Sequence, residues 1–346
     1  MRTFNCGRCG HRVYFGNVVC ENCGAELGHH PELRRIVVID ETVRRCANLE
    51  IAACDWVLDV GEIAKLCLSC RLTRTRPVAD DRAAVDAFRA AEAAKRRLVF
   101  QLLELDLPVK PRRPSGSTPR TDRDDGLAFD LLSSRDDPVT TGHANGLITL
   151  DLAESDPAHR AKVRAKLGEP YRTLLGHFRH ESGHYYWRVA VERGLDLDRA
   201  REVFGDERSD YRGALQRHYR DGAPAGWEAG YITGYASMHP AEDWAETFAH
   251  YLHMRDTLQT ADAFEVSVLG RPSTLPLGPI TIEALVQQWV PLTTAVNELN
   301  RSMGEPDAYP FVLVSAVIDK LRVVHEAIGL MKSGPLRSED VERVAR

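Results

Sequence analysis

The sequence predicts an α+β protein that is mainly helical and begins with a small cysteine-rich β module. Apolar residues recur at helical spacing around His180 and again after Pro240, which predicts two long helices. All eight cysteines fall within the first 70 residues, which predicts a separate module there. With 346 residues, 43% of them hydrophobic, the chain can build a sizeable core plus a small accessory domain.

The first four cysteines form two Cys-x2-Cys pairs separated by ten residues, and they are Cys6, Cys9, Cys20 and Cys23. Each pair is followed by a glycine, Gly10 or Gly24, which allows a turn with positive φ. This spacing is typical of a four-cysteine zinc ribbon, which we place in residues 1–30 with short strands around residues 13–15. Iron in a rubredoxin-like site is one alternative. A disulfide framework is another, but it requires a secreted chain, and the N-terminus shows no apolar signal segment.

The remaining cysteines lie in residues 31–78 and are spaced less regularly, and they are Cys46, Cys54, Cys67 and Cys70. They predict a second zinc site with four cysteine ligands, with free core thiols as the alternative. A zinc site filled by four cysteines has no open position for chemistry, and its metal contributes directly to folding. We therefore expect both modules to hold shape or to present a surface to a protein partner.

Residues 79–346 form the third predicted unit. A helix is expected from Val85 to Leu105, followed by a proline-rich loop at residues 108–126. Residues 142–152 read as a half-buried strand, because Ile148, Leu150 and Leu152 share one apolar side. Further helices are expected at residues 282–299 and 311–328.

The motif His180-Glu181-Ser182-Gly183-His184 lies within a helix that we expect to begin near residues 168–170 and to stop near Gly194. Positions i and i+4 lie one turn apart on the same helix face, so both imidazoles can bind one Zn²⁺. The glutamate next to the first histidine can take the proton from a water molecule that zinc activates. A polar helix face with two ordinary histidines is the alternative.

A third ligand has to come from elsewhere. The pattern HExxHxxGxxH is excluded, because position 187 is Trp and position 190 is Ala. The helix after Pro240 carries Glu242 and Glu246 on one face. We predict Glu242 as the zinc ligand and Glu246 as the acceptor of a hydrogen bond from a zinc-bound histidine. Asp243 is the main competitor for the ligand role, and the weaker ones are His239, His250 and His253.

Two tyrosines, Tyr231 and Tyr235, lie just upstream of this helix. We predict that the Tyr235 hydroxyl donates a hydrogen bond to the oxyanion of the tetrahedral intermediate. A core aromatic side chain is the alternative for Tyr235.

The HExxH motif, the later Glu-x-x-Ala-Glu helix and the tyrosine seven residues before Glu242 together resemble the glutamate-ligand zincins, or gluzincins, such as the catalytic domain of anthrax lethal factor. The whole chain resembles a bacterial family of zinc-binding metallopeptidases with an N-terminal zinc ribbon. The matching segments are residues 141–149, 171–187, 238–251, 299–304 and 307–311. The resemblance implies a zincin-like domain with zinc on His180, His184 and Glu242, Glu181 as base and Tyr235 near the oxyanion. It also implies that the strand at residues 142–152 is the sheet edge to which a substrate peptide adds.

The expected function is therefore a zinc metallopeptidase, a hydrolase with one catalytic and two structural zinc ions, acting on a peptide or protein substrate. A net charge of −5 argues against nucleic-acid binding. No apolar run is long enough for a membrane span, and we expect a cytoplasmic protein. Two alternatives are a zinc-ribbon scaffold protein with a non-catalytic HExxH domain and a hydrolase of a non-peptide amide.

Overall fold

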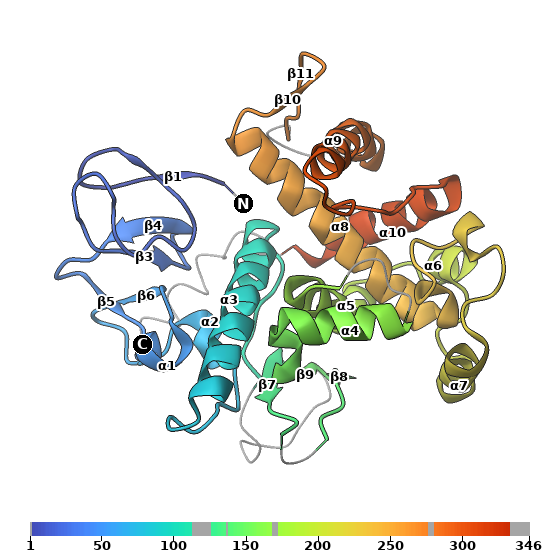
Figure 1. Ribbon diagram of the computed structural model, residues 1–346, viewed down its shortest axis with the longest axis horizontal. Helices are drawn as coiled ribbons and strands as arrows, with labels where there is room; N and C mark the ends of the chain where they lie inside the picture. Colours follow the sequence, from blue (N-terminus) through green and yellow to red (C-terminus); the bar gives the residue numbers. More distant parts are fainter. Residues whose placement is uncertain (1, 113–125, 136–137, 168–171, 276–279, 333–346) are drawn as a thin grey trace.

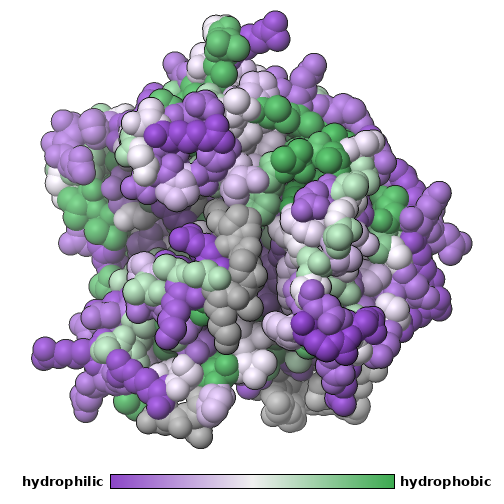
Figure 2. All heavy atoms as spheres, turned by 45° about the vertical axis from the view of Figure 1, so that its right-hand side comes forward, coloured by the Kyte–Doolittle hydropathy of each residue, from purple (hydrophilic) through white to green (hydrophobic). Residues whose placement is uncertain are grey.

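The computed structural model describes residues 2–112, 126–135, 138–167, 172–275 and 280–332, and it confirms the α+β class. Long helices build the body, and the cysteine-rich N-terminal part lies beside helix α3 (Figure 1). Hydrophilic side chains cover much of the face in Figure 2, with smaller hydrophobic groups between them. Every helix in the described part of the chain is too short or too polar to span a lipid bilayer.

The cysteine-rich part contains three antiparallel pairs of short strands and two short helices. The elements are β1 (Phe4–Asn5) with β2 (Arg12–Val13), β3 (Leu27–His30) with β4 (Arg35–Val38), β5 (Val43–Arg45) with β6 (Val57–Asp59), α1 (Leu49–Ala52) and α2 (Leu68–Arg71). The strand expected around residues 13–15 is shorter and ends at Val13. His29 of β3 forms a parallel bridge with Trp56, so the two cysteine modules share backbone pairing.

Helix α3 (Arg82–Glu104) carries this part, close to where the sequence predicted a helix. Asp81 caps its start by accepting a hydrogen bond from the Ala84 N–H. Phe100 near its end packs against an aromatic cluster formed by Phe4, Phe15 and His29. The first module also reaches the far end of helix α8, where Tyr14 stacks on Phe264 with ring centroids 5.5 Å apart.

A three-stranded sheet follows, in the order β7 (Ala128–Leu132), β9 (Leu147–Asp151), β8 (Gly142–Ala144). Ile148 and Leu150 are fully buried, so the predicted apolar side is confirmed. The prediction of one strand over 142–152 at the sheet edge is wrong. Asn145 (φ 49°) and Gly146 (φ 83°) turn the chain back, which makes β9 the central strand and leaves the edge to β8.

The other edge of this sheet is covered by the chain leaving the second cysteine module. Thr73 forms a parallel bridge with Phe129, and the Arg74 N–H donates to the Phe129 carbonyl at 2.9 Å. Of the predicted loop at 108–126, residues 113–125 lie outside the described part of the chain.

The remaining helices surround the two that carry the candidate site, and the further elements are η2 (Leu152–Ser155), α4 (Pro157–Leu167), α5 (Leu174–Glu192), α6 (Leu197–Phe204), α7 (Tyr211–Asp221), η3 (Trp227–Ala229), η4 (Ala236–Met238), α8 (Pro240–Ala263), β10 (Ser267–Val268), β11 (Arg271–Pro272), α9 (Ile282–Ser302) and α10 (Ser315–Met331). Helices α9 and α10 confirm the two predicted C-terminal helices, with small shifts in their bounds. The predicted start of α5 is wrong, because Thr173 caps the helix by accepting from the Gly176 N–H. Residues 168–170 lie outside the described residues.

Helices α5 and α8 pack closely side by side. A Cβ atom at Gly183 would lie 2.9 Å from the Cα atom of Ala245, so only glycine fits at this crossing. The Trp244 indole N–H donates to the Gly183 carbonyl at 2.9 Å, which ties the helices together at the same point. The close approach brings the HExxH face of α5 against the first turn of α8.

Candidate functional site

Three side chains from helices α5 and α8 converge on one point. Nε2 of His180 lies 3.0 Å from Oε2 of Glu242, and Nε2 of His184 lies 3.5 Å from the same oxygen. The three atoms that could bind a metal ion all lie within 4.8 Å of one another. Two imidazoles and one carboxylate are a typical zinc ligand set that leaves a fourth position open. The residues present therefore fit a zinc ion.

The histidines and glutamates of this group shift one another's pKa values. Burial lowers the pKa of His180, but its hydrogen bonds to Glu242 and Glu246 outweigh burial and raise the pKa well above its usual value. Burial raises the pKa of Glu242, but its hydrogen bonds with His180 and His184 outweigh burial and hold it well below its usual range. The carboxylate thus stays ionised although only 2% of Glu242 is exposed, as metal binding requires.

Glu246 lies one turn further along α8 and contacts the other side of the His180 ring. Its Oε1 lies 2.6 Å from Nδ1 of His180, and its Oε2 accepts a hydrogen bond from the Thr233 hydroxyl at 2.8 Å. This geometry fixes the orientation of the ring and leaves Nε2 directed toward Glu242.

Glu181 is buried beside the two histidines on α5. Burial is the main cause of its raised pKa, against which the nearby His180 and His184 act. The His177 ring lies near it, with Nε2 at 3.9 Å from Oε1 of Glu181. Glu181 is therefore a carboxylate in a shielded position next to the candidate metal ligands.

Two tyrosines lie against this group, and the sequence singled out only one of them. The Tyr235 ring lies 5.9 Å from the His180 ring, centroid to centroid, and burial raises the pKa of Tyr235. Tyr211, at the start of α7, donates a hydrogen bond from its hydroxyl to Oε1 of Glu242 at 2.9 Å. Tyr211 carries no local sequence signal, because it is 31 residues from Glu242 in the chain.

The competing ligand candidates point elsewhere. Asp243 pairs with Lys320 of α10 at 2.6 Å, and burial raises the pKa of Asp243 to about 7. His239 caps α8 by accepting from the Ala241 N–H. His250 bonds the Tyr309 hydroxyl at 2.8 Å, and His253 packs its ring against Trp289.

One further histidine that the sequence did not single out reaches the site. His143 of edge strand β8 stacks on His184, with ring centroids 5.8 Å apart and an interplanar angle of 21°. Its Nε2 accepts a hydrogen bond from the Gly146 N–H at 2.8 Å, and burial lowers the pKa of His143 to about 4. Strand β8, which is the edge strand of the sheet among the described residues, thus lies directly beside the candidate metal ligands.

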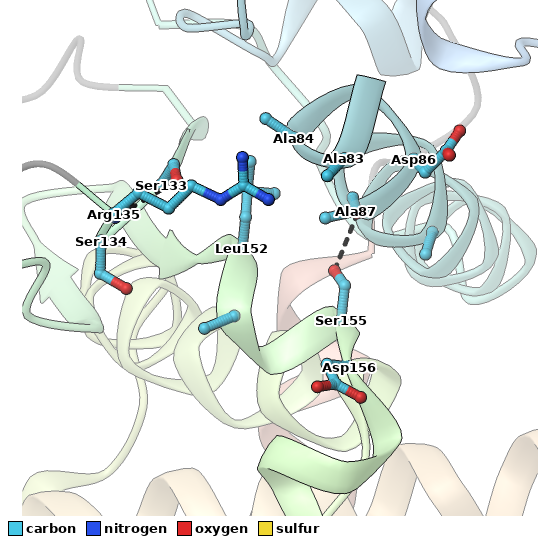
Figure 3. Close-up of a pocket in the computed structure, with 12 residues that line it drawn as sticks. Ala83, Ala84, Asp86, Ala87, Ser133, Ser134, Arg135, Leu152, Ser155 and Asp156 are labelled. Atoms are coloured by element: carbon cyan, nitrogen blue, oxygen red, sulfur yellow. Dashed lines mark hydrogen bonds between the residues drawn. The ribbon is translucent and has the colours of Figure 1, made fainter. Parts of the chain in front are cut away.

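One cavity of the structure borders the candidate site, and another lies apart from it. A small apolar one, of about 50 Å³, is lined by His184 together with Trp187, Phe204 and Trp244. A larger one, of about 400 Å³, lies between α3 and η2, where Ser155 donates to the Ala87 carbonyl (Figure 3). None of the candidate site residues lines the larger cavity.

The cysteines form two compact groups of four, as their spacing predicted. In the first group, the sulfur atoms of Cys6 and Cys23 lie 3.7 Å apart, and Gly10 and Gly24 take φ values of 74° and 68°. In the second group all four cysteines are buried, and their sulfur atoms lie within 4.8 Å of one another. All eight cysteines lie in described residues and none of them forms a disulfide bond, which contradicts the disulfide alternative. Each group matches a zinc ligand set of four thiolates.

Comparisons with known proteins agree with this arrangement. Residues 84–327 match the family model described as "Putative zinc-binding metallo-peptidase", and residues 3–81 match a zinc-ribbon domain model that spans both cysteine groups. The chain is 48% identical over 335 residues to uncharacterized proteins of Mycobacterium bovis and Mycobacterium tuberculosis, covering 95% of each chain. No solved structure matches the chain.

Proposed function

Because the chain belongs to the "Putative zinc-binding metallo-peptidase" family, we propose that it is a zinc-dependent peptidase whose active site is the group on α5 and α8. His180, His184 and Glu242 would hold the ion, and the two cysteine groups would hold two structural zinc ions. Zinc in the histidine site supplies Lewis acidity, which lowers the pKa of water and polarises an amide carbonyl. The observation that carries the proposal is the convergence of both Nε2 atoms on one oxygen of Glu242.

Glu181 acts as the general base in this proposal. It takes the proton from the attacking water and delivers it to the leaving nitrogen. Its burial supports this role, because a shielded carboxylate with a raised pKa both accepts and returns a proton readily. Glu246 and Thr233 keep the His180 ring in place during the reaction.

Tyr235 donates a hydrogen bond to the oxyanion. Its ring packs near His180, and its high pKa keeps the hydroxyl protonated as a donor. The substrate is a peptide or protein segment, which would pair with β8, the edge strand of the described sheet, next to His143. A protein partner for the ribbon and a cytoplasmic location complete the proposal.

The proposal is tested with Glu181→Gln and a matched control, Glu192→Gln, which changes an exposed glutamate at the end of the same helix. N-terminal labelling of a cell extract incubated with each protein reveals newly formed cleavage sites. We expect Glu181→Gln to retain all zinc and to cleave about 10²–10⁴-fold more slowly, while the control equals the wild type. Equal cleavage by Glu181→Gln and the wild type would refute the base assignment. A wild type that binds zinc but cleaves no protein would instead favour a scaffold role.

A further inference from the structure

The start of helix α7 packs against the first turn of α8 through hydrogen bonds and a ring contact. His239, which caps α8, donates from Nε2 to the Ser209 carbonyl at 3.1 Å, and the Ser209 hydroxyl lies 3.0 Å from the same nitrogen. Asp210 caps α7 by accepting from the Gly213 N–H. The Tyr211 ring packs edge-on against His239, with centroids 5.1 Å apart. Tyr211 is thus held in a defined place although 41% of the residue is exposed.

The two oxygens of Glu242 have different partners. Oε2 faces both candidate histidine ligands, whereas Oε1 accepts the hydrogen bond from the Tyr211 hydroxyl at 2.9 Å. We propose that Tyr211 is a positioning residue that holds the outer oxygen of Glu242 and so fixes which oxygen faces the metal. This inference rests on the proposed function and adds a residue that no sequence motif marks.

Physical chemistry supports such a role. A carboxylate can offer a metal one oxygen or both, and a hydrogen bond to one oxygen makes the one-oxygen arrangement more favourable. That arrangement keeps a position free for water. The hydroxyl also gives a hydrogen bond to an oxygen of a carboxylate that is only 2% exposed, and leaving such an oxygen without a partner is costly. Thr233 contacts the outer oxygen of Glu246 in the same way, so a hydroxyl stands behind each carboxylate.

The test compares Tyr211→Phe with Tyr219→Phe, which removes a hydroxyl from a 66% exposed tyrosine on the same helix. Zinc affinity of the histidine site is measured by competition with a chromophoric chelator, and the visible spectrum is recorded after loading with Co²⁺. We expect Tyr211→Phe to bind zinc about 10-fold more weakly and to change the Co²⁺ spectrum. Tyr219→Phe should match the wild type in both measurements.

An unchanged affinity together with an unchanged Co²⁺ spectrum in Tyr211→Phe would overturn the inference. Phe keeps the ring against His239, so the variant isolates the loss of the Tyr211 hydroxyl. If the wild type itself holds no zinc beyond its cysteine sites, the proposed function fails. If the wild type binds and cleaves but Tyr211→Phe behaves like it, only this inference fails.

Discussion

Nδ1 of His180 lies 2.6 Å from Oε1 of Glu246, so a partly buried carboxylate on α8 holds the ring on the side opposite to Glu242. Removing this carboxylate should weaken zinc binding by the histidine site about 10- to 100-fold, because outer hydrogen bonds orient metal-binding imidazoles. We expect Glu246→Ala to show the larger loss and Glu246→Gln the smaller one, since an amide oxygen still accepts from the ring. Chelator competition measures both affinities. Equal affinity in all three proteins would contradict this role for Glu246.

Substitutions of the neighbouring acids Glu242 and Asp243 on α8 should change different properties, zinc binding in one case and stability in the other. Glu242→Ala should lose the zinc of the histidine site and keep the two cysteine-bound ions, because Glu242 places one oxygen against Nε2 of both histidines. Asp243→Asn should keep all zinc but unfold more easily by about 3–5 kcal/mol, because it leaves Lys320 buried without its charge partner. Elemental analysis and urea unfolding separate the two outcomes. Loss of zinc from Asp243→Asn with full retention by Glu242→Ala would reverse the ligand assignment.

Acid should destabilise the aromatic junction at His29. Burial lowers the pKa of His29 to about 3 from an ordinary 6.5, so the folded protein keeps this ring neutral. Between these values the unfolded chain binds a proton that the folded chain does not bind, and stability therefore falls as the pH drops. The loss from His29 amounts to about 2 kcal/mol between pH 7 and pH 5.

The variant His29→Phe should lack this acid-induced loss of stability, and it keeps an apolar ring among Phe4, Phe15 and Phe100. Denaturant unfolding at several pH values checks it, and the cysteine sites contribute equally to both proteins. Identical pH dependence in the variant and the wild type would show that His29 is not responsible.

Arg96 should be a major link between α3 and the second cysteine module. Its guanidinium donates to the Ala52 and Ala53 carbonyls and pairs with Asp55 at 2.9 Å, all in a buried position. Arg96→Met should destabilise the protein by about 3–5 kcal/mol, because Asp55 loses its buried charge partner. Arg82→Met, at an exposed position of the same helix, is the control. Thermal unfolding measures both, and equal melting temperatures would contradict the prediction.

Much of the candidate site followed from local spacing. His180 and His184, and likewise Glu242 and Glu246, are separated by four residues, and this separation places each pair on one helix face whatever the rest of the fold does. The cysteine pairs are local in the same sense, and their sulfur atoms do meet in two groups. The roles of these residues in binding and catalysis stay predictions.

Other parts depend on contacts that no local pattern shows. Tyr211 and His143 reach the site only because α7 docks on α8 and because the sheet lies next to α5. The turn between β8 and β9 could have been predicted from the sequence, since Asn145-Gly146 is a typical hairpin turn that requires positive φ. The start of α5 could have been predicted likewise, because Thr173 is a favourable capping residue.

Helix α8 has 24 residues and is therefore about 36 Å long. Glu242 lies in its first turn, and Phe264, just beyond its last, rests on Tyr14 of the first cysteine module. The first cysteine module therefore contacts this helix at the end opposite to Glu242, and the length of the helix separates that contact from the candidate ligand.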